Sequence, residues 1–182
     1  LEEDLTGKVS RKSGNLLGAA HEHYTIAILM RMGLNALQAN FPNETFDLLV
    51  SAYDKDPKEN EDAKKMFLRA QVKTASRSVS FKGGVRSGKD RTYNAEENVD
   101  KSYQYDSNMV DLVIGVDRNT LDLYIIPVSY VEKWGSSKST NKLEPLKNRW
   151  DLLVNWTPEY IEKVKYELPD FEKGEDEEIT SF

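Results

Sequence analysis

An amide and a cation lie two residues apart in one short apolar stretch, at Gln71 and Lys73. Side chains alternate between the two faces of a strand, so both groups project from the same face. Two carboxylates precede them where apolar residues are expected: Glu22 lies partly on the apolar face of a helical pattern, and Asp47 opens an apolar strand. A buried carboxylate needs a partner or a metal ion. Two carboxylates and a lysine on adjacent elements could therefore surround a hard cation.

These four residues depend on elements that the local sequence predicts. Apolar residues at helical spacing predict a helix from Gly14 to Met32, and Gly33 ends it. Apolar runs bounded by turn residues predict strands at 35–40, 46–53, 65–74, 109–116 and 120–128. We expect strands 46–53 and 65–74 to form an antiparallel hairpin. Short helices are expected at 128–134, 143–154 and 158–166.

This order of elements predicts an α/β domain with a mixed central β-sheet flanked by helices. A chain of 182 residues is long enough for one domain with a substantial core. We expect a polar leader at 1–13, one domain at 14–168 and an acidic, disordered tail at 169–182. Residues 76–101 are rich in Gly, Ser, Lys and Arg, and we expect an extended hairpin or a mobile loop that is long enough to be functional.

The composition excludes several classes of protein. The chain has no cysteine, which excludes disulfides, zinc–thiolate sites and a thiol nucleophile and fits a reducing compartment. No apolar stretch approaches the roughly 18 residues of a membrane span. The acidic N-terminus does not resemble a signal peptide. We therefore expect a cytoplasmic protein of prokaryotic or viral type.

The charge is unevenly distributed along the chain. The net charge is −6, but the segment from Asp170 onward holds six acidic residues against one lysine. Between Lys64 and Arg91 there are nine basic residues and one acidic residue. Such a basic stretch can contact a phosphate backbone. An ordinary solvated hairpin would account for it equally well.

The polar residues also resemble a known family. The sequence resembles the PD-(D/E)xK nuclease superfamily, in its Q-x-K variant. The resemblance lies in an acid in the first helix, an acid entering a strand, and then Gln-x-Lys on the paired strand. That variant includes homing and restriction-type endonucleases. The resemblance extends over residues 18–153. Tyr103, Asp111 and the pair Ile126-Pro127 are similar to features of small archaeal and cyanobacterial endonuclease domains. The resemblance implies a restriction-endonuclease-like core.

The resemblance implies a role for each site residue. Asp47 would bind Mg²⁺, with Mn²⁺ as a substitute, and the Gln71 side-chain carbonyl and the Val72 backbone carbonyl would bind the same ion. Lys73 would hold or activate the attacking water. Glu22 would bind the ion through a water molecule or orient Lys73. Because glutamine replaces an acid at Gln71, we expect weaker metal binding than in the commoner pattern.

The resemblance also implies partners. The substrate would be DNA, cut by a metal-dependent endodeoxyribonuclease in homing, restriction, junction resolution or repair. The residues expected to bind DNA are Arg77, Lys82, Arg86, Lys89 and Arg91. Double-strand cutting implies a homodimer. The acidic tail would bind a protein partner or mask the DNA groove.

Structural roles remain as alternatives for these residues. Gln71 and Lys73 could form the solvent face of an edge strand, Asp47 could cap a turn, and Glu22 could pair with Arg31 or Lys73. His21 and His23 lie on different helix faces and cannot share a metal ion, although one could contact a phosphate, and Asp111 would support the sheet. At the level of function, the alternatives are a non-catalytic nucleic-acid- or protein-binding module on the same fold and an RNase.

Overall fold

Five strands form the central sheet of the protein, whose computed structural model describes residues 11–39, 44–84 and 102–171. Their order across the sheet is β1 (Ala36–Gln38), β2 (Leu48–Tyr53), β3 (Lys65–Ala75), β7 (Leu112–Asp117) and β8 (Leu123–Pro127). β2 and β3 form the expected antiparallel hairpin, β3 and β7 run parallel, and β7 and β8 run antiparallel. The mixed sheet predicted from the sequence is therefore confirmed.

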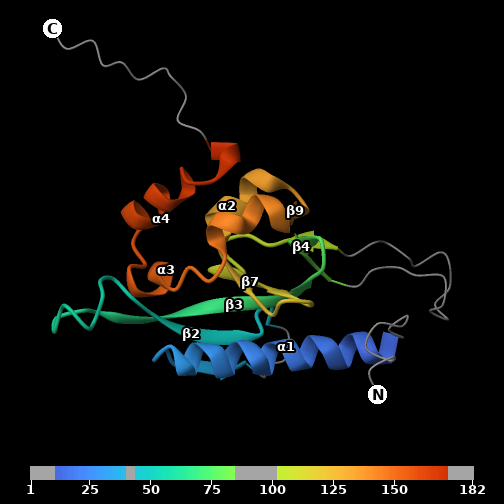
Figure 1. The fold of residues 1–182 in the computed structure, drawn as a ribbon, viewed down its shortest axis with the longest axis horizontal. Coiled ribbons are helices and arrows are strands. Elements are labelled where there is room, and N and C mark those ends of the chain that lie inside the picture. The colour runs from blue at the N-terminus through green and yellow to red at the C-terminus, as the bar shows by residue number, and fades with distance from the viewer. Residues whose placement is uncertain (1–10, 40–43, 85–101, 172–182) are drawn as a thin grey trace, which may run out of the picture.

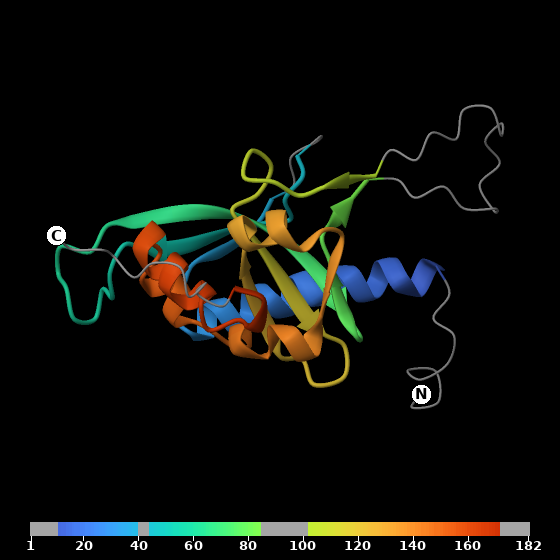
Figure 2. The same ribbon diagram turned by 90° about the horizontal axis from the view of Figure 1, so that it is seen from above.

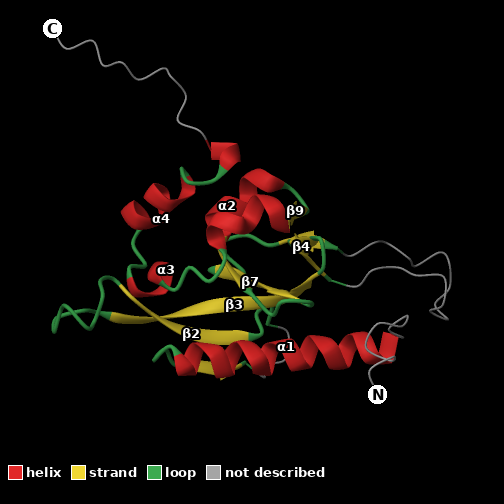
Figure 3. Ribbon diagram, in the orientation of Figure 1, coloured by secondary structure: helices red, strands yellow, loops and turns green. Residues whose placement is uncertain are grey.

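Helices cover both faces of the sheet (Figure 1). α1 (Arg11–Arg31) forms the layer on one face, and α2 (Val128–Trp134), α3 (Asp151–Val154) and α4 (Pro158–Lys165) lie on the other (Figure 3). Seen from above, the C-terminal helices lie in front of the strands and α1 runs behind them (Figure 2). Every residue of β7 and β8 is buried, as expected for strands that are covered on both faces.

α1 packs on the sheet through His21, Thr25 and Leu29, which are all buried. These residues follow one another at intervals of four, so they form one face of the helix. The helix begins three residues before the predicted start at Gly14 and ends at Arg31, next to the predicted end. The predicted helix is therefore confirmed.

Two small ribbons lie outside the central sheet. β4 (Ser78–Ser80) pairs with β9 (Ser137–Ser139), and β5 (Lys82–Gly83) pairs with β6 (Tyr103–Gln104). The first part of the polar segment 76–101 thus consists of short strands. Its remainder, 85–101, lies outside the described residues, as do 1–10, 40–43 and 172–182. Of the expected leader and tail, the structure describes 11–13, where α1 begins, and 169–171, which form the 3₁₀ helix η3 (Pro169–Phe171).

The prediction of one helix at 143–154 is wrong. The 3₁₀ helix η2 (Thr140–Leu146) and the short helix α3 lie there instead. Pro145 cannot donate a backbone hydrogen bond, and Asn148 has a φ of 53°, in the left-handed region. Both features end a regular helix, and local apolar spacing did not reveal them.

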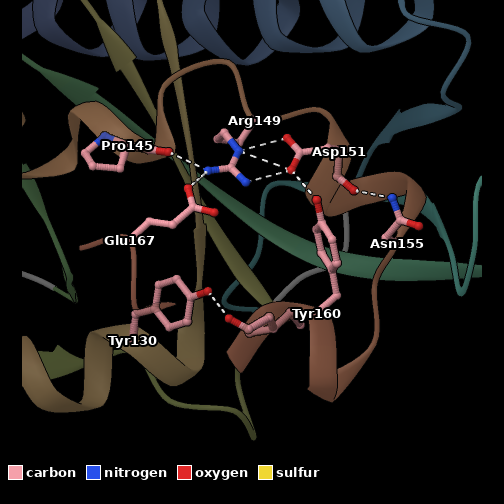
Figure 4. A network of polar contacts seen from close by, with 8 residues as sticks. Tyr130, Pro145, Arg149, Asp151, Asn155, Tyr160 and Glu167 are labelled. Atoms are coloured by element: carbon pink, nitrogen blue, oxygen red, sulfur yellow. Dashed lines mark hydrogen bonds and ion pairs between the residues drawn. The ribbon is translucent and has the colours of Figure 1, made fainter. Parts of the chain in front are cut away.

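A polar network fixes the segment between η2 and α4 (Figure 4). The guanidinium of Arg149 donates to the Asp151 carboxylate at 2.8–3.1 Å and to the Pro145 carbonyl at 3.1 Å. The Tyr160 hydroxyl donates to the same Asp151 carboxylate at 2.8 Å. Because a bidentate guanidinium–carboxylate pair is geometrically specific, this network holds α3 and α4 in fixed positions beside the sheet.

Candidate active site

Asp47 lies where three strands meet. Its backbone N–H donates to the Ala70 carbonyl at 2.9 Å, and its carbonyl accepts from the Ala39 N–H at 2.8 Å. In the β2–β3 register Leu48 pairs with Ala70, so Asp47 lies one residue beyond that pair, beside Gln71. The backbone of Asp47 is therefore held on both sides before β2 begins.

The Asp47 carboxylate is bound by groups of β3. One carboxylate oxygen, Oδ2, accepts from the Val72 backbone N–H at 2.8 Å, and the Gln71 side-chain amide donates to the same oxygen. Gln71 is 9% exposed, and β3 is the middle strand of the sheet. The alternative in which Gln71 and Lys73 form the solvent face of an edge strand is therefore wrong. Asp47 does not cap a turn through these bonds, because its described partners lie on β3.

Burial raises the pKa of Asp47 to about 6. The Glu22 carboxylate contributes to this rise by charge repulsion, whereas the Val72 N–H, the Lys73 ammonium and the Gln71 amide oppose it. Burial and repulsion prevail over the three stabilising partners. The positive charge and hydrogen-bond donors around Asp47 therefore do not fully compensate the ionised carboxylate for its burial.

Glu22 reaches this region from α1. Its carboxylate accepts a hydrogen bond of 3.1 Å from the Gln38 side chain on β1, and it is half-buried. It is close enough to raise the pKa of Asp47, but it does not line the cavity described below.

Lys73 follows Gln71 on the same face of β3. Its Nζ lies 5.1 Å from the centre of the Tyr105 ring, a distance typical of a cation–π interaction. Tyr105 is 2% exposed, so this ring is fixed in the core. The Tyr105 ring therefore restricts where the Lys73 ammonium can lie. The contact between Lys73 and Tyr105 could not be predicted from the sequence, because strand periodicity gives no information about contacts between segments distant in the chain.

Asp47, Gln71 and Lys73 line one cavity of about 500 Å³. Its other lining residues come from the segment before β2, from the β5–β6 ribbon and from the segment that follows it, and they include Glu44, Thr45, Lys82, Gly83, Tyr103 and Tyr105. A Cβ added at Gly83 would lie 2.7 Å from the Tyr103 ring. A side chain at this position would therefore displace the Tyr103 ring, which lies against Gly83 within the β5–β6 ribbon.

The expected DNA-binding residues are only partly described. Lys82 is exposed and lines the cavity. Arg77 is also exposed, but it does not line the cavity, and its carbonyl accepts from the Thr140 N–H. Arg86, Lys89 and Arg91 lie outside the described residues.

Oxygen atoms that could hold a cation converge on one point. The Gln71 amide nitrogen donates to Asp47 Oδ2 and lies 3.5 Å from the Val72 carbonyl oxygen. A carboxylate and a backbone carbonyl thus face the same donor. Within 11–39, 44–84 and 102–171 there is no group of three or more His, Asp or Glu side chains arranged to hold a metal. Any metal ligand set at this place would therefore combine carboxylate, amide and backbone carbonyl.

Other polar residues singled out in the sequence have structural roles. Asp111 accepts from the Arg69 backbone N–H at 2.7 Å and forms a salt bridge of 2.9 Å with its guanidinium, which confirms its role as a support of the sheet. His21 is 3% exposed and its Nδ1 lies 2.7 Å from the Thr74 hydroxyl, whereas His23 is exposed. The two histidines therefore lie on different faces of α1, as expected. Burial and the nearby Arg118 lower the pKa of His21.

No helix within the described part of the chain is long and apolar enough to cross a membrane.

Comparisons with known proteins bear on the fold. No family model matches the sequence, and no curated protein matches it. The structure is similar to a solved structure of a bacterial homing endonuclease, I-Ssp6803I, with a TM-score of 0.58 and 18% sequence identity. The match covers 78% of this chain and 93% of that chain. The protein therefore has the fold of that homing endonuclease, a mixed central sheet flanked by helices.

Proposed function

We propose that the protein is a metal-dependent endodeoxyribonuclease of the Q-x-K type. The observation that carries this proposal is that Asp47, Gln71 and Lys73 line one cavity, in which burial leaves the Asp47 carboxylate short of positive charge. A purely structural carboxylate is usually matched by its partners, as Asp111 is by Arg69. The mismatch at Asp47 fits a site that is completed by a cation and a substrate.

The donor set fits Mg²⁺, with Mn²⁺ as a substitute. Oxygen atoms are the ligands that Mg²⁺ prefers, and it retains water molecules when few protein ligands are offered. Asp47 and the Val72 carbonyl would bind it directly, Gln71 would do so once its amide turns to present oxygen, and Glu22 would act through water. When bound, such an ion screens the phosphate charge and lowers the pKa of a coordinated water molecule.

Lys73 is the residue we propose to act on the attacking water. Lys73 lines the cavity together with Asp47 and Gln71, and its ammonium lies over the Tyr105 ring. From there it can hold the water by hydrogen bonding and stabilise the negative charge that develops on the phosphate. Tyr105 would be a positioning residue for Lys73.

DNA is the substrate that the fold and the cavity favour. A solved structure that shares this fold is that of a homing endonuclease. Lys82, on the rim of the cavity, can contact a backbone phosphate. Cutting both strands of a duplex would need two such sites, so we expect a homodimer. The biological role, in homing, restriction, junction resolution or repair, depends on the DNA that is recognised.

A cleavage assay tests this proposal. The protein is incubated with supercoiled plasmid, linear duplex, a four-way junction and RNA, each with Mg²⁺, Mn²⁺ or EDTA. We expect metal-dependent cutting of DNA that is lost in Asp47→Asn and Lys73→Met. Lys65→Met is the matched control, because Lys65 is also on β3 and also lies over aromatic rings, those of Tyr53 and Phe67. It should cut like the wild type.

The alternatives predict other outcomes of the same assay. Cleavage of RNA alone would identify an RNase on this fold. Binding of DNA without cleavage of any substrate, in either metal, would favour a non-catalytic module. Equal loss of cutting in Lys65→Met and Lys73→Met would contradict the assigned site.

A further inference from the structure

Tyr103 lines the cavity together with Asp47, Gln71 and Lys73, but no step proposed above uses it. It lies on β6, where the ribbon register places it directly opposite Gly83. Its side chain is half-buried, and its hydroxyl has no hydrogen-bond partner among the described residues. Most tyrosine hydroxyls in such a setting have a partner. The hydroxyl in the cavity wall is therefore available to a ligand.

The hydroxyl end of the Tyr103 ring is held against the backbone of Gly83. A Cβ added at Gly83 would lie 2.7 Å from the ring atoms Cε2 and Cζ and 2.8 Å from the hydroxyl oxygen. The Tyr103 and Tyr105 rings meet edge to face, with centroids 5.9 Å apart and an interplanar angle of 81°. Because Tyr105 is buried, this contact has a fixed support. The Tyr103 hydroxyl is therefore held in place before any ligand binds.

The lining of the cavity combines carboxylates with hydrogen-bond donors. The carboxylates belong to Glu44 and Asp47. The donors include the side chains of Lys73, Lys82 and Tyr103. Carboxylates repel an anionic ligand, so a phosphate in this cavity needs the donors as well as a metal ion. Of these three donors, only the tyrosine hydroxyl carries no charge.

Lys73 and Tyr103 share one support. The Lys73 ammonium lies 5.1 Å from the centre of the Tyr105 ring, and the Tyr103 ring meets that ring as well. A single buried side chain therefore relates the positions of the two donors to each other. A phosphate bound at this wall can be met by a charged and a neutral donor together.

We propose that the Tyr103 hydroxyl donates a hydrogen bond to a non-bridging phosphate oxygen of DNA in this cavity. Tyrosine is among the side chains that contact phosphate oxygens in protein–DNA complexes. The proposal rests on the function proposed above and adds a substrate-binding residue to it. Because every DNA sequence has the same phosphates, this contact binds the backbone and does not distinguish bases.

Tyr103→Phe tests this contact because it removes only the hydroxyl oxygen. Binding to a short duplex is measured by fluorescence anisotropy in EDTA, where a metal-dependent nuclease binds without cutting. We expect Kd to rise roughly 10-fold, as for a lost hydrogen bond to a charged group. The slope of log Kd against log salt should stay unchanged, because no charge is removed. The Tm should also stay unchanged, since the hydroxyl has no partner among the described residues to lose.

Tyr53→Phe is the matched control for this substitution. Tyr53 is also a half-buried tyrosine, and it is the last residue of β2, at the end remote from Asp47. It does not line this cavity, so its variant should bind the duplex like the wild type.

Gly83→Ala displaces the same hydroxyl without removing it, because the added methyl group crowds the Tyr103 ring. We expect a rise in Kd similar to that in Tyr103→Phe. Combining the two substitutions should give little further rise, since both act on one hydrogen bond. Gly18→Ala is the control: a Cβ there meets no atom within 4 Å, and Gly18 lies on α1, outside the cavity. Its variant should keep the wild-type Kd.

An unchanged Kd in Tyr103→Phe would overturn the proposal. So would full additivity of Tyr103→Phe and Gly83→Ala, because the two would then act on different contacts. These results are separable from those of the cleavage assay. Weaker binding in Tyr103→Phe, in a protein that cuts no substrate, would contradict the proposed nuclease and leave this contact standing. Cutting by Tyr103→Phe with wild-type affinity would do the reverse, and a protein that neither binds nor cuts DNA would overturn both.

Discussion

The backbone N–H of Val72 donates a hydrogen bond of 2.8 Å to the carboxylate of Asp47. β2 begins at Leu48, so this bond lies at the point where β2 no longer covers the edge of β3. The two backbone groups of one strand residue are directed to the same side in an antiparallel pair. The Val72 carbonyl therefore faces the same region as the Asp47 carboxylate, and the end of β2 creates the opening in which a ligand could reach both.

Asp47→Asn should stabilise the protein at neutral pH when no divalent metal is present. The folded pKa of about 6 lies above the usual 3.8, so the folded state holds the proton more tightly than the unfolded state. Wild-type stability therefore falls as the pH rises from about 4 to 6. We expect Asp47→Asn to gain roughly 1–3 kcal/mol at pH 7.5, and little at pH 4, in urea denaturation.

The control for this prediction is Asp62→Asn. Asp62 is exposed, and its hydrogen bond with Lys55 lowers its pKa, so the sign of its pH dependence is opposite. If Asp47→Asn were less stable than the wild type at pH 7.5, the Asp47 carboxylate would be a well-matched structural group.

Gln71→Glu should make the protein less stable without metal and more responsive to it. The Gln71 amide now donates to Asp47, and a glutamate there would place a second negative charge against a buried carboxylate. We expect a lower Tm in EDTA, a larger rise in Tm with Mg²⁺ or Mn²⁺, and binding at least as tight as in the wild type by calorimetry.

Gln104→Glu is the matched control for this substitution. The Gln104 amide also donates a hydrogen bond, of 3.1 Å, but to the Val131 carbonyl, and it does not line the cavity. Its variant should lose stability without gaining a metal response. Loss of metal binding in Gln71→Glu would show that Gln71 is not a metal ligand.

Lys82→Ala should weaken DNA binding equally for all sequences. Lys82 is an exposed cation at the cavity, and a contact with a phosphate contributes mainly through the release of counterions. We expect the slope of log Kd against log salt to fall by about one. Lys58→Ala, an exposed lysine that does not line this cavity, should leave the slope unchanged. An unchanged slope in Lys82→Ala would place DNA elsewhere on the surface.

Asp111→Asn should reduce stability without affecting the metal response. Asp111 is held by the backbone and guanidinium of Arg69, and both side chains are about one-third exposed. We expect a loss of about 1–2 kcal/mol in urea denaturation, since hydrogen bonds to charged groups are involved but partly screened. Mg²⁺ should raise the Tm of this variant as much as that of the wild type. A smaller rise would make Asp111 part of the metal site.

Local sequence patterns determined the elements and their order. Helical spacing gave α1, alternating apolar runs gave the strands, and turn residues gave the β2–β3 hairpin, because these signals depend on neighbours within a few residues. The same patterns identified Asp47, Gln71 and Lys73 as polar residues where apolar ones were expected. The prediction of one helix at 143–154 was wrong because Pro145 and Asn148 interrupt a regular helix despite the local apolar spacing.

Only the tertiary structure decided what those residues contact. A strand has the same period of two at the edge and at the centre of a sheet, so the burial of Gln71 depended on the pairing of β3 with β7, far along the chain. The raised pKa of Asp47 comes from burial and from Glu22, which lies on a different element. The position of the Lys73 ammonium is restricted by Tyr105, which is also on a different element.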